Sequence, residues 1–287
     1  MIIAIVGPTG VGKTKMSIEL AKKYNAIVVN CDAMQVYKEL NIGTAKVTEQ
    51  EKENVPHYLF DICEVCENYT VFDYQKDLRK IISLYKDKNI IIVGGTGLYL
   101  KAGLFDYRFS VEEKKETYDN LTNAELYDLA LKKDKNMDIH ENNRKRLIRF
   151  LNKENIEVVE PKLLYNALFI GLTTDRDTLY NKINQRVDKM FSEGLLEEVL
   201  TLYKKGYDCK SINTGIGYKE LYEYFKGNIM LEEAKELIKQ RSRKYAKRQY
   251  TWFNNQMNIT WFNVNYDNFN ETIEDVEKYI EKSISES

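Results

Sequence analysis

The sequence lacks an apolar run long enough to cross a membrane, has few cysteines, and carries almost no net charge. Hydrophobic residues make up 43% of the 287 residues and charged residues 30%, the composition of a globular protein that folds in water. Four cysteines are too few for a disulfide scaffold in a chain of this length, and no signal peptide precedes the first apolar run. We therefore expect a cytoplasmic protein with one sizeable core.

The cysteines and histidines give little support for a metal site. Cys63 and Cys66 form a C-x-x-C pair close to His57, but no second pair of cysteines or histidines follows at the spacing that zinc requires. We therefore interpret His57 and His140 as structural residues.

The net charge of −1 hides two strongly basic stretches. "NNRKRLIR" spans residues 142–149, and "KQRSRKYAKRQY" spans residues 239–250 without an acidic residue. A local basic stripe is the electrostatic feature that a nucleic-acid-binding protein needs, whatever its overall charge. A solvated helix face explains such a stretch equally well, so the charge pattern alone leaves both interpretations open.

Short β-branched runs alternate with helical patterns along most of the chain, which predicts an α/β fold with a largely parallel sheet. The expected strands are 2–6, 26–30, 89–93, 167–172 and 259–264, and the expected helices are 13–24, 73–86, 97–103, 177–193, 195–205, 231–253 and 272–283. Residues 110–164 differ, because they are rich in charged residues and Asn and short of β-branched runs. We predict a core built from 1–109 and 165–287, with 110–164 as a helical insertion.

A phosphate-binding loop joins the first expected strand to the first expected helix. The sequence "GPTGVGKT" fits the pattern G-x-x-x-x-G-K-[ST], whose backbone N–H groups surround phosphate oxygens at a helix N-terminus. Lys13 would reach a terminal phosphate and Thr14 would hold Mg²⁺. The loop alone fits kinases, ATPases and GTPases equally. The expected phosphate-binding residues are Gly7, Pro8, Thr9, Gly10, Val11, Gly12, Lys13 and Thr14.

Two further strands are followed by groups that can do chemistry. Asp32 comes just after strand 26–30, and a second Gly-rich turn containing Thr96 comes just after strand 89–93. In open α/β sheets, ligands bind outside the carboxyl ends of the strands, where these residues meet. A motor protein or GTPase would end such a strand in a carboxylate that manages Mg²⁺ and water, whereas this strand ends in glycines and Thr96. Asp32 is therefore the carboxylate placed to act as a base or a Mg²⁺ ligand.

Several motifs together resemble the tRNA dimethylallyltransferases, also called isopentenyl-diphosphate:tRNA transferases. These motifs are "GPTGVGKT", "CDAMQVYKELNIGTAK", "VPHYLFDI", "IIVGGTGLYLKAGL", "GLLEEVL", "TGIGYKEL" and "YAKRQYTWF". They extend from the N-terminus to about residue 264, and the second and the last two are far more specific than the phosphate loop. The resemblance implies a P-loop kinase-like parallel sheet with flanking helices and a helical insertion.

The resemblance also implies a reaction. The phosphate loop would hold the diphosphate of dimethylallyl diphosphate, and the dimethylallyl group would pass to the exocyclic amine of the adenosine 3′ to the anticodon in tRNA. Asp32 would take the proton of the amine, and Arg186 in "INQRVDKM" would neutralise the leaving diphosphate together with Lys13 and Mg²⁺ on Thr14. Thr96 would lie close to the bond that breaks.

Recognition of tRNA follows from the same resemblance. The adenosine must be flipped out of its loop to reach a buried site. The basic cluster at the end of the insertion would grip the anticodon stem-loop, and the 239–250 stretch would either contact the RNA backbone or close over the diphosphate. The protein is expected to act as a monomer. The residues expected to contact tRNA are Asp32, Ala33, Met34, Gln35, Thr96, Lys145, Arg146 and Arg149.

Three other functions are compatible with parts of the sequence. An isopentenyltransferase that modifies a free nucleotide would use the same donor chemistry, but it would need no basic insertion. A small-molecule kinase would use the phosphate loop and Asp32, but it would give the "GGTGLY" and "AKRQ-x-TW" motifs no role. A non-catalytic RNA-binding protein would use only the basic stretches. The insertion is shorter than is common in the family, and "NNRKRLIRFLN" matches the family less well than the active-site motifs do.

Overall fold

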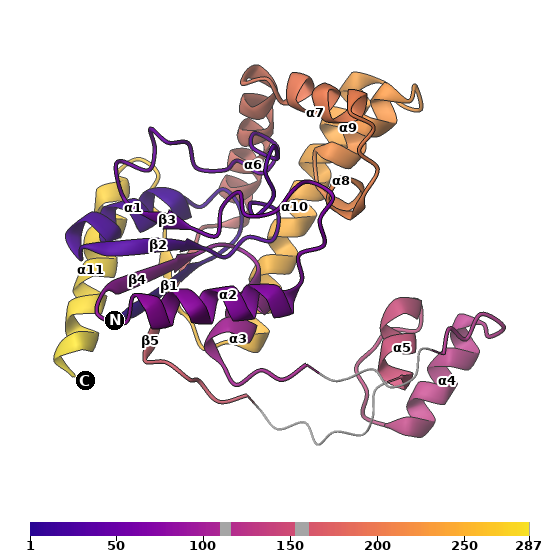
Figure 1. Ribbon diagram of the computed structural model, residues 1–287, viewed down its shortest axis with the longest axis horizontal. Coiled ribbons are helices and arrows are strands. Elements are labelled where there is room, and N and C mark those ends of the chain that lie inside the picture. Colours follow the sequence, from indigo (N-terminus) through magenta and orange to yellow (C-terminus); the bar gives the residue numbers. More distant parts are fainter. Residues whose placement is uncertain (110–115, 153–160, 287) are drawn as a thin grey trace. The chain divides into compact units, whose positions relative to one another are not determined.

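The computed structural model describes residues 1–109, 116–152 and 161–286 of the chain. It divides into two compact units (Figure 1). The larger unit comprises Met1–Phe105 and Leu163–Ser287, and the smaller unit comprises Asp106–Lys162. The stretch predicted as an insertion, 110–164, overlaps the smaller unit.

A parallel sheet forms the centre of the larger unit, and within the described residues it has six strands in the order β3-β2-β4-β1-β5-β6. The central strand β1 is a continuous run of buried apolar residues, as a strand covered on both faces must be. This confirms the predicted α/β fold. The strands are β1 (Ile2–Val6), β2 (Ala26–Asn30), β3 (His57–Tyr58), β4 (Asn89–Val93), β5 (Ala167–Thr173) and β6 (Thr260–Asn263).

Helices cover both faces of the sheet. Ile3 and Ile5 of β1 pack on the face covered by α1 (Lys13–Lys23) and α11 (Phe269–Ser285). The alternating residues Ile2 and Ala4 pack on the other face, which is covered by α2 (Val71–Leu84) and α3 (Gly97–Leu104). Figure 1 shows the sheet between these two pairs of helices. The resulting three-layer arrangement leaves the carboxyl ends of the strands as the place where loops can build a site.

The remaining helices of the larger unit surround the segment that follows β2. Val36, Tyr37 and Leu40 of that segment share one apolar core with residues from these helices. The longest of these helices, α10, also reaches back to the sheet, where Phe253 is buried and Trp252 packs on Gly97. The sequence predicts both of these residues as core anchors. The helices are α6 (Arg176–Ser192), α7 (Leu195–Lys204), α8 (Lys210–Thr214), α9 (Tyr218–Phe225) and α10 (Leu231–Gln256).

The smaller unit contains two helices, α4 (Asn123–Lys133) and α5 (Arg144–Leu151), among its described residues. Each begins at a residue whose side chain accepts a hydrogen bond from the first turn, and the two helices share a small core around Leu126 and Leu147. Of this unit, 110–115 and 153–160 lie outside the described residues.

Two of the four cysteines form a disulfide between distant segments, which the sequence analysis does not predict. Cys66 is bonded to Cys209, which lies 143 positions along the chain, while Cys31 and Cys63 are free and buried. Within the described residues there is no group of three or more side chains suited to a metal ion. Among those same residues no helix has the length and apolar character that would let it cross a membrane.

Candidate active site

A cavity of about 540 Å³ opens at the carboxyl ends of the central strands. It is lined by residues that follow β1, β2 and β4 and by residues of α6 and α10. Most of the site residues predicted in the larger unit face it, whereas Gly7, Pro8, Val11, Ala33 and Thr96 do not belong to the lining. The predicted residues that line the cavity are Thr9, Gly10, Gly12, Lys13, Thr14, Asp32, Met34, Gln35 and Arg186.

The phosphate loop turns sharply between β1 and α1. Gly10 and Gly12 have φ angles of +94° and +83°, in the left-handed region that glycine adopts without strain. The Tyr266 hydroxyl, from the segment before α11, donates a hydrogen bond to the carbonyl of Gly10 at 3.1 Å. The loop is therefore held from outside while its inner side faces the cavity.

The Lys13 ammonium lies against the loop itself. It donates hydrogen bonds to the carbonyls of Gly7 at 3.0 Å and Pro8 at 2.7 Å. Burial among protein atoms, reinforced by the positive charge of Arg186 and opposed by Asp32, lowers the pKa of Lys13 from 10.5 to about 7. A diphosphate would supply the negative charge that this group lacks, so the site is suited to bind an anion.

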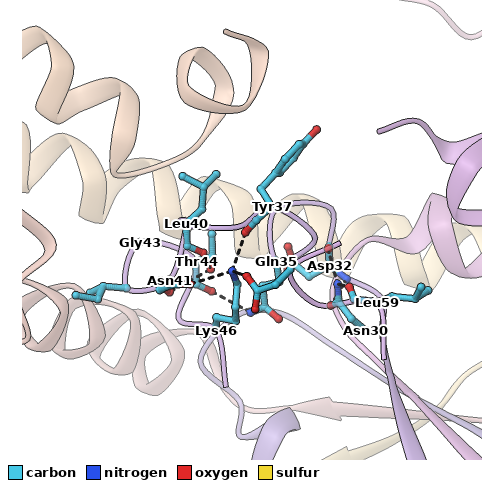
Figure 2. A network of polar contacts seen from close by, with 12 residues as sticks. Asn30, Asp32, Gln35, Tyr37, Leu40, Asn41, Gly43, Thr44, Lys46 and Leu59 are labelled. Carbon is cyan, nitrogen blue, oxygen red and sulfur yellow. Dashed lines mark hydrogen bonds and ion pairs between the residues drawn. The ribbon is translucent and has the colours of Figure 1, made fainter. Parts of the chain in front are cut away.

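Asp32 is held in a tight turn after β2. The buried side chain of Asn30 accepts a hydrogen bond from the Asp32 N–H at 2.8 Å and donates to the carbonyls of Asp32 at 3.0 Å and Leu59 at 2.9 Å (Figure 2). One carboxylate oxygen of Asp32 accepts the N–H of Met34 at 2.9 Å. The carboxylate thus has a fixed place at the cavity wall, as a catalytic base requires.

Thr96 supports this turn from the neighbouring strand. Its hydroxyl accepts a hydrogen bond from the Ala33 N–H at 3.0 Å, and its own N–H donates to the Cys31 carbonyl at 3.0 Å. Burial raises the pKa of the Cys31 thiol to about 12, so this cysteine is not a reactive nucleophile. Thr96 therefore holds the backbone on both sides of the predicted base, at Cys31 and at Ala33.

Gln35 and Arg186 meet at one carbonyl. The Gln35 amide donates to the carbonyls of Thr44 at 3.0 Å and Ala45 at 3.3 Å, and an Arg186 nitrogen lies 3.5 Å from the same Thr44 oxygen. Burial lowers the pKa of Arg186, with Asp32 opposing, but a guanidinium stays charged at any physiological pH. The cavity therefore has a fixed cation on α6 facing Lys13 and Asp32.

Gln249 of α10 links the two glycine-rich turns, and its role is not among those predicted from the sequence. It is 5% exposed, and its amide oxygen accepts the N–H of Thr9 at 3.0 Å. Its amide nitrogen donates to the Gly95 carbonyl at 3.1 Å. A side chain at residue 95 would overlap this amide, which explains the glycine there. The signal in the sequence was the "AKRQ" motif, which names the residue without revealing its partners.

The basic stretch 239–250 divides into three groups. Lys239 forms an ion pair with Asp188, and Arg241 with Glu220, so these cations stabilise the helical packing. Arg248 lines the cavity, as do Ser242 and Tyr245 from the same helix. Lys244 and Lys247 are exposed. The cations of the stretch therefore differ in their surroundings, and its role toward the RNA backbone or the diphosphate stays a prediction.

The predicted RNA-binding cations of the insertion all come from α5. Lys145, Arg146 and Arg149 are exposed, whereas the neighbouring Arg144 donates to the carbonyls of Leu121 at 2.7 Å and Tyr118 at 2.6 Å. Arg144 therefore stabilises the smaller unit, whereas the three predicted cations lie at its surface.

Comparison with known proteins places the chain in a family. A family model described as IPP transferase matches residues 35–256. The tRNA dimethylallyltransferase of Bacillus subtilis (strain 168) is 47% identical, over 92% of this chain and 90% of that protein. That of Anoxybacillus flavithermus is 44% identical, over 98% of this chain and 96% of the relative.

A solved structure extends the likeness to three dimensions. The full-length tRNA isopentenylpyrophosphate transferase from Bacillus halodurans has a TM-score of 0.78 and 41% identity, with 99% of this chain and 97% of that chain covered. These relatives cover the phosphate loop and Asp32, which precede the residues matched by the family model. The chain therefore belongs to the tRNA dimethylallyltransferases of the IPP transferase family.

Proposed function

We propose that this protein transfers the dimethylallyl group of dimethylallyl diphosphate to the exocyclic amine of the adenosine 3′ to the anticodon in tRNA. The observation that carries the proposal is that a phosphate loop, a fixed carboxylate and a half-buried arginine line one and the same cavity. A donor diphosphate and an acceptor amine can therefore reach each other beside Asp32.

The donor diphosphate would lie on the phosphate loop. Its oxygens would accept hydrogen bonds from the loop N–H groups and meet Lys13 and Arg186, which both line the cavity. These donors are in place before the reaction, so they can stabilise the charge that grows on diphosphate as it leaves. Binding also supplies the anion that favours the charged form of Lys13.

The residues at the loop fit a Mg²⁺ ion that is shared with the diphosphate. Thr14 is exposed at the start of α1 and lines the cavity, which Asp32 also faces, so hydroxyl and carboxylate oxygens are both present. Among the described residues there is no cluster that would cage a metal without the substrate. Bound there, the ion would neutralise charge on the leaving diphosphate.

The transfer replaces a carbon–oxygen bond with a carbon–nitrogen bond and moves one proton from the amine to Asp32. The adenosine amine nitrogen bonds to the first carbon of the dimethylallyl group, and the carbon–oxygen bond to the diphosphate breaks, with its electron pair leaving on the diphosphate. The amine is a weak nucleophile because its lone pair is delocalised into the ring, so Asp32 accepts its proton as the bond forms. Asn30 and Thr96 keep the Asp32 turn in place for this step.

The acceptor would enter as a flipped base. Met34 and Gln35 line the cavity beside Asp32, where they would meet the adenine, whereas Ala33 lies in the same turn but does not line the cavity. Lys145, Arg146 and Arg149 would contact the phosphates of the anticodon stem-loop. A solved relative described as a eukaryotic dimethylallyltransferase acting on tRNA has a TM-score of 0.76 and 29% identity to this chain, which supports a tRNA substrate. We further propose that the protein works as a monomer in the cytoplasm.

Transfer of label tests the proposal. The protein is incubated with dimethylallyl diphosphate labelled in its carbon chain, unmodified tRNA and Mg²⁺, without ATP. We expect label in the tRNA, on the adenosine 3′ to the anticodon, and one diphosphate released for each group transferred. Label on free AMP but not on tRNA would assign the protein to the nucleotide-modifying enzymes instead. ATP consumption with a small hydroxyl acceptor would assign it to the kinases.

A further inference from the structure

A loop between β2 and β3, residues 40–46, forms one wall of the cavity. Gly43, Thr44 and Ala45 line it, and the Thr44 carbonyl accepts the Gln35 amide and lies beside Arg186. The position of this loop therefore sets the position of one group predicted to meet the acceptor and of one predicted to meet the donor. We call it the 40–46 loop.

Lys46 holds the 40–46 loop from the inside. Its ammonium donates to the Tyr37 carbonyl at 2.7 Å and to the Asn41 side chain at 3.0 Å (Figure 2). It also donates to the Asp61 carboxylate at 2.5 Å. The Thr44 hydroxyl adds a bond to the Leu40 carbonyl at 2.7 Å. The bonds to Asn41 and Leu40 close the loop on itself, and the bonds to Tyr37 and Asp61 tie it to neighbouring segments. None of the four attaches the loop to the helices that face it.

Glu198 of α7 makes that attachment. One of its carboxylate oxygens accepts the N–H groups of Asn41 at 3.2 Å and Ile42 at 2.7 Å, and the other accepts the N–H of Gly43 at 3.2 Å. Three successive N–H groups thus converge on one carboxylate. Hydrogen bonds to a charged acceptor are roughly twice as strong as those between neutral groups.

Tyr218 of α9 completes the arrangement. Its hydroxyl donates to Glu198 at 2.7 Å, and its side chain is fully buried against Gly43, where a Cβ atom would lie 2.6 Å from the ring. Any side chain at residue 43 would push the loop off the tyrosine. The family motifs "GLLEEVL" and "TGIGYKEL" contribute Glu198 and Tyr218 respectively, and the "NIGT" segment contributes the loop.

We propose that Glu198, oriented by Tyr218, is a positioning residue for the transfer reaction. It does not line the cavity, so it acts through the 40–46 loop on Gln35 and Arg186. The helices α7 and α9 thereby fix the wall against which acceptor and donor meet. This proposal rests on the proposed function, and its test separates the two.

The first test measures single-turnover transfer to tRNA with both substrates saturating. We expect Glu198→Gln to slow transfer at least about tenfold, because the amide cannot accept all four hydrogen bonds, and Tyr218→Phe to slow it by a smaller factor. Two matched controls lie on the same helices. Glu197 is exposed beside Glu198, and the Tyr222 hydroxyl, one turn after Tyr218, is buried and has no hydrogen-bond partner among the described residues. Glu197→Gln and Tyr222→Phe should therefore transfer like wild type.

A double-mutant cycle separates positioning from mere stabilisation of the fold. If Glu198 acts through Gln35, the double variant Glu198→Gln/Gln35→Ala should be slower than the slower single variant by no more than about threefold. If the double variant is slowed by the product of the two single-variant factors, the proposal is overturned. A Glu198→Gln protein with a lower Tm and an unchanged transfer rate would also overturn it. If wild type transfers nothing, the proposed function fails, and binding of inorganic diphosphate then decides. If Glu198→Gln weakens the binding of diphosphate in the wild-type background but not in an Arg186→Lys background, Glu198 positions Arg186. If Glu198→Gln binds diphosphate as tightly as the wild-type protein does, the proposal is refuted.

Discussion

Binding of the donor should depend on pH because of Lys13. Its pKa of about 7 in the free protein means that at neutral pH about half of the molecules carry Lys13 as an uncharged amine. A bound diphosphate favours the charged form and returns the pKa toward 10.5 or above. Each donor bound should therefore take up about half a proton at pH 7 and almost one proton at pH 8.5.

The size of the effect follows from the two pKa values. Between pH 7.5 and pH 9 the charged fraction of free Lys13 falls about 24-fold, so the Kd for the donor should rise by about the same factor while the complex keeps its proton. Two other residues that line the cavity, His57 and Tyr245, do not titrate between pH 7.5 and pH 9, because burial lowers the pKa of His57 and raises that of Tyr245. The stability of the free protein depends on pH in the opposite direction from donor binding: it increases as pH rises. The unfolded chain holds the proton up to about pH 10.5, so this group adds to the free energy of unfolding as pH rises from 7, by at most about 5 kcal/mol.

Calorimetry of donor binding in buffers of different ionisation enthalpy measures the proton uptake directly. The Lys13→Arg variant is the matched control, since an arginine keeps its charge and should show a flat profile across the same window. A wild-type Kd that is constant from pH 7.5 to 9, with no proton uptake, would refute the assignment of a neutral Lys13 in the free site.

Three further predictions concern the supports of the site and its selectivity. Gln249→Ala strands the Thr9 N–H and the Gly95 carbonyl, so it should lower the free energy of unfolding by about 2–4 kcal/mol and raise the KM for the donor, as measured by urea unfolding and steady-state kinetics. Asn30→Ala removes the amide that holds the Asp32 turn and should reduce kcat more than tRNA affinity; equal losses in both would contradict this. ATP, if it binds the phosphate loop, should compete with dimethylallyl diphosphate, and a ternary complex containing both would exclude a single diphosphate site.

The sequence predicts the elements of the sheet well because its strands are continuous apolar runs joined to strong helical patterns. It misses β3, which is only His57–Tyr58 at the sheet edge, and the short helices α8 and α9. The "TGIGYKEL" motif is recognised as a motif, but its helical part is shorter than the window over which periodicity can be judged.

The candidate site is predictable where groups follow the ends of parallel strands. Topology alone brings the phosphate loop, Asp32 and Thr96 to one edge of the sheet. Contacts between distant segments are not predictable in this way. Gln249 meets Thr9 across 240 positions, and Glu198 meets Ile42 across 156, in both cases through backbone groups that carry no sequence signal. The disulfide between Cys66 and Cys209 also joins distant segments, 143 positions apart, so the spacing of the cysteines does not reveal it.

The most direct measurement of the central claim is the single-turnover rate of dimethylallyl transfer to tRNA by Asp32→Asn. An amide of nearly the same shape keeps the turn but cannot accept the proton, so the rate should fall by about 10²–10⁴-fold while tRNA and donor affinities stay within a few-fold. Asp87→Asn is the control, because Asp87 is exposed in the turn before β4, at the opposite edge of the sheet. Transfer by Asp32→Asn at the wild-type rate would contradict the assignment of Asp32 as the base, and with it the account of this site.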